Sequence, residues 1–539
     1  MSGKKNARIS LCMIVKDEES VLARCLESAK GHVDEIVIVD TGSTDRSMEI
    51  ARDFGATVLE HPWGNDFAAA RNVAIEAATG DWILSLDADE VLTPLAGRDI
   101  KKVAKKNKFV GAYLPLRDEQ DDGKVTVSLM FRFFRNRPEI RWKYRLHEQV
   151  LPAALELVRA EGRRLAQVEG EILHDGYREE VMEAKGKNER NLRLFELQLK
   201  DTPDDLYVLY KYADFLRRFD GRKEEALKPL AHGYDILKDL DPERRKEYTF
   251  TGELCAIYAL ELFKQDENDR GLEVTTFGME ECRESAHLHY AHGIGLSHAR
   301  RWEEAAKAFE TCQSFHGKPM LVPPQAQITG PGARKGRIRA LAHQGETSAA
   351  TQEAWDLCSE YPGDEEAFTL FVDAAVLERD WKTTTNRLIT RVTEQPACGV
   401  SWMKGGELLF RMRLFDKALP WLLRATELCA DPGEAWGLAG ECYLAAGHYE
   451  QAVDAFSRGI EHQNLRARAG VLLLSLAYEI ELAEPVDASD QTILAETRRM
   501  ISVLRDLGHD KLTSRLHEAG RHLEEADPQT HEFLEAALA

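Results

Sequence analysis

Two aspartates, Asp87 and Asp89, follow the apolar run of the segment 81–90, DWILSLDADE. The run predicts a short buried strand, so both carboxylates are expected at its carboxyl end, where open α/β folds bind their ligands. Paired carboxylate oxygens suit Mg²⁺ or Mn²⁺ carrying a diphosphate. A D-x-D pair by itself is a weak signal, because a second pair at 239–241 lies in a polar helical region. The position of Asp87 and Asp89 after a strand therefore carries the prediction.

The first half of the chain alternates strand and helix patterns. Strands are predicted at the apolar runs 9–15, 35–40, 56–60 and 81–87. Ser43 or Thr44 is expected to cap the second helix and Asp66 the third. Continuous apolar strands separated by helices indicate a parallel sheet covered on both faces. From about 110 to 175 the pattern turns to short strands, which predicts a mixed extension of this sheet.

The second half repeats itself. Gly406 and Ala418 recur 34 residues later as Gly440 and Ala452. Glycine at a close helix crossing and alanine between paired helices resemble the tetratricopeptide repeat. Weaker copies extend the array to about seven or eight units. The segment 327–336, QITGPGARKG, is expected to be an internal loop, because Gly and Pro break helices. Helices over about 467–525 are expected to cap the array.

Composition narrows the class of protein. The chain of 539 residues is long enough for two or three domains. It has no run of eighteen apolar residues and no apolar N-terminal leader, which predicts a cytoplasmic protein without a transmembrane segment. Its nine cysteines are scattered, as expected in a reducing compartment. Residues 1–200 carry a net charge of −2 and residues 201–539 carry −19. Such an acidic half argues against nucleic acid as a partner.

Four segments together resemble the family 2 glycosyltransferases of GT-A fold. They are 15–28, 39–51, 68–90 and 145–150. The similar subgroup contains lipopolysaccharide-core glucosyltransferases and the S-glycosyltransferases that modify glycocin peptides, some with helical repeats. The resemblance implies an α/β GT-A catalytic domain with a Rossmann-like mixed sheet at 1–200. The repeats then form an all-α tetratricopeptide-like solenoid at 201–539.

The resemblance also implies how the nucleotide sugar is bound. Val15 and Glu18 match the region that contacts the nucleotide base, and Asp40 matches a carboxylate that accepts from the base or ribose. Gly42 lets the following turn approach the nucleotide closely. Arg71, in the A-R-N motif, matches a basic residue that faces the nucleotide.

The same resemblance implies a metal site and a catalytic base. Asp87 and Asp89 match the metal aspartates, and Asp89 is expected to bind Mg²⁺ or Mn²⁺ directly. His174 matches a histidine that completes the metal shell, and Glu148, in R-L-H-E, matches the base. The alanines at 68–70 depart from the commoner pattern and leave the acceptor side open.

The chemistry of sugar transfer agrees with these residue types. The leaving nucleoside diphosphate gathers charge, which a divalent ion and nearby cations stabilise. Arg132 and Arg135 are candidates for those cations. A carboxylate that takes the proton of the acceptor hydroxyl contributes about 10²–10⁴-fold. A single displacement inverts the anomeric carbon, and a thiolate acceptor would depend less on the base.

Structural roles remain open for several of these residues. Asp40 could shape a helix cap, and Arg71 could be an ordinary charge on a helix face. Glu148 could be a structural ion-pair partner, or another carboxylate could be the base. His174 could be a hydrogen-bonded histidine at a strand end.

The predicted function is a metal-dependent inverting glycosyltransferase with a nucleotide-diphosphate sugar as donor. A peptide or protein is the favoured acceptor, because stacked helix pairs form a concave groove that suits an extended chain. One alternative acceptor is a cell-surface glycan or lipopolysaccharide core. Another alternative is an inactive interaction scaffold. The repeats are also compatible with a homodimer, and the sugar and the nucleobase stay open.

Overall fold

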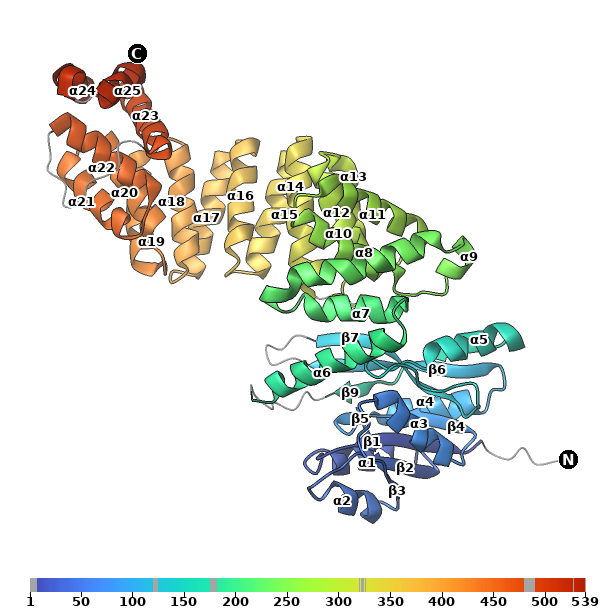
Figure 1. Ribbon diagram of the computed structural model, residues 1–539. Helices are drawn as coiled ribbons and strands as arrows, with labels where there is room; N and C mark the ends of the chain where they lie inside the picture. The colour runs from blue at the N-terminus through green and yellow to red at the C-terminus, as the bar shows by residue number, and fades with distance from the viewer. Residues whose placement is uncertain are drawn as a thin grey trace. The chain divides into compact units, whose positions relative to one another are not determined.

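The computed structural model describes residues 7–119, 125–174, 182–318, 320, 324, 326–478, 490–526 and 528–538. The chain divides into two compact units, Met1–Gly336 and Arg337–Ala539. The first unit holds an α/β domain and the first helix pairs, and the second holds the remaining helix pairs (Figure 1). The division near residue 200 between catalytic and repeat domains stays a prediction.

One nine-stranded mixed sheet forms the α/β domain. Its strands are β1 Ile9–Val15, β2 Glu35–Asp40, β3 Thr57–Glu60, β4 Trp82–Ser85, β5 Glu90–Leu92, β6 Phe109–Glu119, β7 Val125–Arg135, β8 Arg164–Gln167 and β9 Ile172–His174. Their order is β3-β2-β1-β4-β7-β6-β9-β5, with β8 paired to β6. The first four strands in this order are parallel, and β7 runs antiparallel to β4 and β6. The predicted fold class and its mixed extension are confirmed.

Helices cover both faces of the sheet (Figure 1). They are α1 Leu22–Ala29, α2 Ser47–Asp53, α3 Phe67–Ala77, α4 Pro94–Ala104 and α5 Leu151–Glu161. Strand β1 is buried along almost its whole length, as its continuous apolar run predicts. Side chains of α1 and α4 pack in one hydrophobic core, and those of α3 and α5 in another.

One of the two predicted helix caps is correct. Asp66 caps α3 by accepting a hydrogen bond from the N–H of Ala69. The helix α2 begins only at Ser47, so the prediction that Ser43 or Thr44 caps it is wrong. Both residues instead contact Asp17. Ser43 Oγ accepts a hydrogen bond from the N–H of Asp17, and the Asp17 carboxylate accepts one from the N–H of Thr44. These contacts join the loops that follow β1 and β2.

The helical part of the first unit follows the α/β domain. Its helices are α6 Met182–Asp201, α7 Leu206–Leu216, α8 Lys223–Asp239, α9 Pro242–Arg245, α10 Thr251–Phe263, α11 Asn268–Glu281, α12 Ala286–His298 and α13 Trp302–Gln313, with a 3₁₀ turn at Asp220–Arg222. The helix α14, Ala333–Gln344, begins in the first unit and ends in the second.

The second unit continues with helices in antiparallel pairs. They are α15 Thr347–Glu360, α16 Glu365–Glu378, α17 Trp381–Glu394, α18 Gly399–Arg411, α19 Phe415–Leu428, α20 Gly433–Ala445, α21 Tyr449–Glu461, α22 Leu465–Tyr478, α23 Gln491–Asp506, α24 Asp510–Ala526 and α25 Pro528–Leu538. The predicted C-terminal helices are therefore present, apart from 479–489, which lie outside the described residues.

The repeat positions have the geometry that their residue types require. A Cβ at Gly406 would lie 2.7 Å from Leu422, and one at Gly440 would collide with Phe456. Ala418 and Ala452 are completely buried. Small residues thus let paired helices cross closely, which confirms the tetratricopeptide-like array.

The segment predicted to be a loop is helical. Residues Ile328–Gly332 form a π-helical turn that runs directly into α14. The backbone kink lies at Gly330, and Pro331 is tolerated because the start of a helix leaves N–H groups unpaired in any case. The prediction of an internal loop at 327–336 is wrong.

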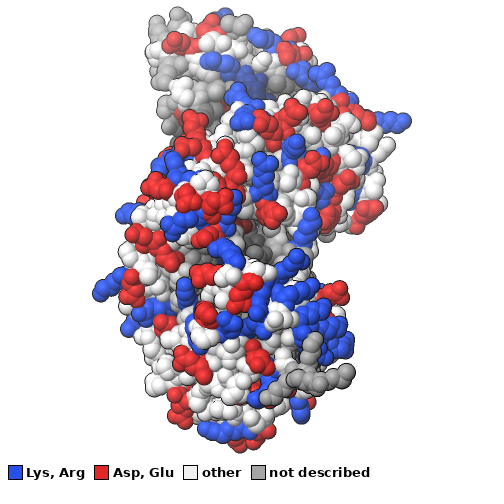
Figure 2. Space-filling view, turned by 90° about the vertical axis from the view of Figure 1, so that its right-hand side faces the viewer, with Lys and Arg blue, Asp and Glu red and all other residues white. Residues whose placement is uncertain are grey.

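Acidic and basic side chains are interspersed over the face shown in Figure 2. None of the described helices is long and apolar enough to cross a membrane.

Candidate active site

Asp87 lies between two buried arginines just after β4. Its Oδ1 accepts a hydrogen bond from Arg71 Nη2 at 2.6 Å, and its Oδ2 accepts one from Arg132 Nη2 at 2.7 Å. Arg71 comes from α3, and Arg132 comes from β7, the antiparallel neighbour of β4. Burial by itself would raise the pKa of Asp87, but the two guanidinium groups outweigh it and hold that pKa well below its usual range. Asp87 is therefore ionised.

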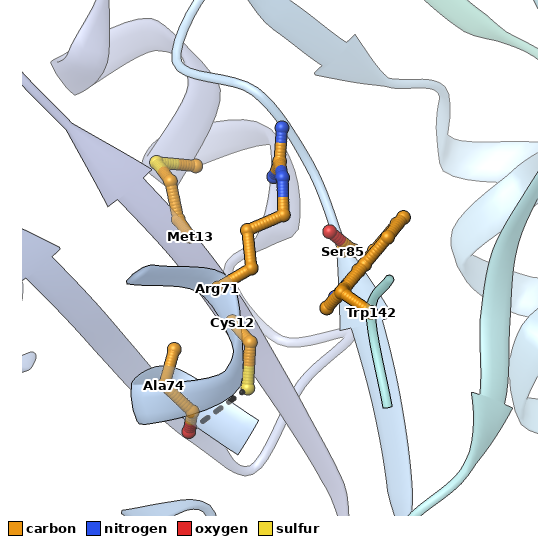
Figure 3. A pocket seen from close by; sticks show the side chains of 6 residues that line it. All are labelled: Cys12, Met13, Arg71, Ala74, Ser85 and Trp142. Atoms are coloured by element: carbon orange, nitrogen blue, oxygen red, sulfur yellow. Dashed lines mark hydrogen bonds between the residues drawn. The ribbon is translucent and has the colours of Figure 1, made fainter. Parts of the chain in front are cut away.

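The two arginines are not ordinary surface charges. Each side chain is only 9% exposed, although the Asp87 side chain between them is 35% exposed. Among the described residues, Arg71 Nη1 and Arg132 Nε are buried without a hydrogen-bond partner. Arg71 also borders a narrow pocket, lined by Cys12, Met13, Arg71, Ala74, Ser85 and Trp142 (Figure 3). The cluster thus holds unused donor capacity beside an accessible carboxylate, which suits a bound anionic group.

Asp89 forms a separate cluster with His174. His174 Nε2 lies 3.2 Å from Asp89 Oδ2, and its Nδ1 lies 3.1 Å from Asp118 Oδ1. The sheet sets this arrangement, because His174 is paired with Glu90 on β5 and with Asp118 on β6. The hydrogen bond to Asp89 raises the pKa of His174 to about 9 against its partial burial. The sequence signal for His174 identified a residue beside Asp89, but Asp118 went unnoticed.

A divalent cation fits the Asp89–His174 pair. Among the described residues, no ready-made group of three or more His, Cys, Asp or Glu side chains surrounds a metal position. A carboxylate oxygen and an imidazole nitrogen 3.2 Å apart can nevertheless share one cation in place of the proton. Asp118 then occupies the place of the carboxylate that commonly orients a metal-binding histidine. Asp87 stays a predicted ligand, since each of its oxygens has only one described partner.

Glu90 is a site residue that sequence reasoning missed. Its side chain is 3% exposed, and its Oε1 accepts from Arg132 Nη2 at 2.9 Å. Its Oε2 accepts from the N–H of Asp87 at 2.9 Å. Burial raises the pKa of Glu90 above its ordinary value, against the opposing effect of Arg132. The available signal was a glutamate directly before the apolar pair Val91–Leu92, where a strand begins.

Glu148 joins the same network through Arg71. Arg71 Nε donates to Glu148 Oε1 at 2.5 Å, so one guanidinium bridges Asp87 and Glu148. The Glu148 side chain is 13% exposed and lies in the loop between β7 and α5. The structure therefore brings the candidate base to the candidate nucleotide site, in an ion pair. Its catalytic role stays a prediction.

The residues predicted to contact the nucleotide lie together at the carboxyl ends of β1 and β2. Val15 pairs with Asp40 in the sheet register, and the N–H of Glu18 donates to Ser47 Oγ at 2.7 Å. The buried Asp40 carboxylate accepts from the N–H groups of Gly42 and Ser43, both at 3.0 Å. Gly42 has a φ of +110°, which favours glycine. Asp40 shapes this turn, and its contact with a nucleotide stays a prediction.

Arg135 does not belong to the site. It pairs with Trp82 at the start of β4, and its guanidinium carbon lies 4.6 Å from the Trp82 ring centroid. Its Nε donates to the carbonyl oxygen of Phe109 at 2.8 Å. The suggestion that Arg135 stabilises a leaving group is therefore wrong, because the antiparallel course of β7 carries it to the opposite edge of the sheet.

Comparison with known proteins agrees with this geometry. Residues 10–156 match the family model described as glycosyl transferase family 2. A TPR repeat-containing protein of Synechococcus elongatus is 38% identical over 301 residues, which are 56% of this chain and 72% of that protein. Residues 10–156 of the chain belong to glycosyltransferase family 2. The chain is a glycosyltransferase with a tetratricopeptide-like helical part.

Other similar proteins cover less. The glycosyltransferase SunS of Bacillus phage SPbeta is 29% identical over 248 residues, 44% of this chain and 55% of its own length. A solved tetratricopeptide repeat protein of Parabacteroides merdae is 14% identical, with a TM-score of 0.32, over 47% of this chain and 92% of its own. This glycosyltransferase thus spans about half of SunS.

Proposed function

We propose that this glycosyltransferase moves a sugar from a nucleoside-diphosphate sugar to a peptide or protein acceptor in a metal-dependent reaction that inverts the anomeric carbon. The supporting observation is the accessible, ionised Asp87 between two buried arginines, next to the Asp89–His174 pair. Guanidinium groups suit the diphosphate, and carboxylate oxygens with an imidazole nitrogen can bind a divalent cation.

Each part of the donor is bound by different residues. Asp87, Asp89 and His174 would hold Mg²⁺ or Mn²⁺, and the cation would neutralise charge on the leaving diphosphate. Arg71 and Arg132 place two positive charges beside the phosphate groups. Asp87 keeps both guanidinium groups oriented toward the donor. The loops after β1 and β2, with Val15, Glu18, Asp40 and Gly42, receive the nucleoside.

Glu148 takes the proton from the acceptor. Its ion pair with Arg71 links proton uptake to charge on the donor, because both depend on the same guanidinium group. As Glu148 becomes neutral, Arg71 loses one anionic partner and can interact more strongly with the departing diphosphate. This coupling favours the direction of transfer.

The acceptor assignment rests on the helical repeats. Stacked helix pairs form concave surfaces that suit extended peptides. Co-expression with candidate peptides, followed by mass spectrometry, tests the assignment against purified glycans as competing acceptors. A mass increase of one sugar residue on a peptide is expected. If only the glycans are modified, the acceptor is a glycan and not a peptide.

A donor assay tests the reaction itself. Purified protein is incubated with a panel of nucleotide sugars and Mn²⁺, and release of the nucleoside diphosphate is measured. One donor is expected to turn over, and EDTA is expected to stop the reaction. Failure of every donor, together with an inability to bind any nucleoside diphosphate in calorimetry, would refute the proposal.

A further inference from the structure

The loop that carries Glu148 has an unusual backbone. Tyr144 has a φ of +78° and His147 a φ of +55°, both in the left-handed region. Non-glycine residues keep this conformation only where neighbouring groups fix it. The loop around Glu148 therefore needs support from elsewhere in the molecule.

That support comes from the first helices after the α/β domain. The N–H of Arg145 donates to Gln198 Oε1 on α6 at 2.9 Å, and its guanidinium Nη2 contacts Asp201 at 2.8 Å. Tyr144 Oη donates to Asp205, the N-cap of α7, at 3.2 Å. Each contact joins the catalytic loop to a helix of the helical part, within the same compact unit.

Tyr207 on α7 contacts the two residues that flank Glu148 in the sequence. Its hydroxyl donates to the carbonyl oxygen of His147 at 3.1 Å and accepts from Gln149 Nε2 at 2.9 Å. One hydroxyl thus holds the residue before Glu148 and the residue after it. The Tyr207 ring is packed against Tyr144, at 5.0 Å between centroids, and against Phe250, at 5.5 Å. The ring is fixed by packing, and the hydroxyl is then fixed relative to the loop.

We propose that Tyr207 is a positioning residue for Glu148, so that helix α7 forms part of the active site. The inference rests on the proposed role of Glu148 as the base. The two hydrogen bonds of Tyr207 set the direction of the Glu148 side chain between Arg71 and the acceptor. The helical part then contributes to catalysis through the position of Glu148, in addition to any part it has in acceptor binding.

The first test is Tyr207→Phe in the full chain, which keeps the ring and removes the hydroxyl. Tyr210→Phe is the matched control, because Tyr210 lies on the same helix and stacks on the same Phe250 at 5.3 Å. With Tyr207→Phe, kcat is expected to fall about tenfold, since small misplacements of reacting groups cost that much or more. The donor KM and the melting temperature are expected to match those of the control.

A double-mutant cycle tests whether Tyr207 acts through Glu148. In a Glu148→Gln background, Tyr207→Phe is expected to have no further effect on kcat. An equal loss of kcat in both backgrounds, or an unchanged kcat in Tyr207→Phe alone, overturns the inference. If Glu148→Gln is itself fully active, the proposed base is wrong, which is a different result from the failure of Tyr207 alone.

A second variant keeps the inference testable if Tyr207→Phe does not fold. Gln149→Met removes the amide that donates to the Tyr207 hydroxyl and leaves the bond to His147. Loss of this one bond is expected to lower kcat by a smaller factor than Tyr207→Phe, again with an unchanged donor KM. An unchanged kcat in a folded Gln149→Met protein counts against the proposal that the two hydrogen bonds of Tyr207 position Glu148.

Discussion

Each unit contains a carboxylate held between two arginines, but the arginines are buried in the first unit and the carboxylate is buried in the second. In the first unit, Asp87 is held by Arg71 and Arg132, and the carboxylate is 35% exposed while the arginines are 9% exposed. In the second unit, Glu441 on α20 is held by Arg466 and Arg499, at 2.9 and 2.6 Å. Here the carboxylate is 6% exposed and the arginines are 31% and 36% exposed.

This difference distinguishes the candidate binding site from a structural ion pair. Arg466 and Arg499 also contact Glu496, so their charge is satisfied between neighbouring helices. Arg71 and Arg132 instead keep buried nitrogens without partners among the described residues. A buried donor without a partner costs about 1–3 kcal/mol. Such a cost is offset when a ligand supplies the acceptor, and among the described residues the two arginines beside Glu441 have no buried nitrogen of this kind.

Asp89→Ala should have the largest effect, because it removes the carboxylate that is proposed to bind the cation. Transfer is expected to fall about 10³-fold, together with metal-dependent nucleotide binding. The melting temperature should change little, since the Asp89 side chain is 38% exposed. Turnover and calorimetry with and without Mn²⁺ measure both quantities. Full metal-dependent binding in this variant would show that the cation is held elsewhere.

Asp87→Asn and Glu441→Ala test the comparison directly. Asp87→Asn is expected to lower transfer about 10²-fold, because both arginines lose the charge that orients them. Glu441→Ala is expected to leave kcat unchanged and to destabilise the second unit by about 1–3 kcal/mol, a reduced cost because its arginines reach solvent. Kinetics and denaturant unfolding separate the two outcomes. An equal loss of activity in both variants would remove the distinction between the clusters.

The sequence predicted the parts of the site that depend on local pattern. The apolar run before Asp87 defined a strand end, and the glycine and alanine period defined the helix pairs. Asp66 was identified as a cap because the residue type and the helix start coincide. These features depend on neighbours within a few residues.

Features that depend on long-range pairing were not predictable in the same way. Whether Arg132 or Arg135 enters the site is decided by the register of β7 against β4, and the sequence contains no signal for that register. Glu90 meets Arg132, and Asp118 meets His174, only across strands. Arg71 bridges Asp87, 16 positions away, and Glu148, 77 positions away, and the three residues lie on separate segments. The helical turn at 328–332 also depends on packing, which overrides the local preference of Gly and Pro.

Glu90→Gln should have a smaller effect than Asp87→Asn. The amide oxygen can still accept from the N–H of Asp87, but Arg132 loses one of its two anionic partners. The donor kcat/KM is expected to fall about tenfold, the size typical of losing one charged hydrogen bond. Asp99→Asn is the control, since this carboxylate contacts Lys102 and the N–H of Gly170 in the same domain. A loss as large in the control would indicate general destabilisation of the α/β domain.

Arg132→Gln and Arg135→Gln examine the difference between two arginines on one strand. They are three positions apart, roughly 10 Å along the strand. Arg132→Gln is expected to weaken donor binding. Arg135→Gln should leave kcat and the donor KM within about twofold and lose only its contact with Trp82, a cation–π contact of roughly 0.5–1 kcal/mol. Steady-state kinetics of both variants with one donor decides the matter. Equal weakening by the two substitutions would contradict the register of β7, and with it the placement of every group that reaches the site from that strand.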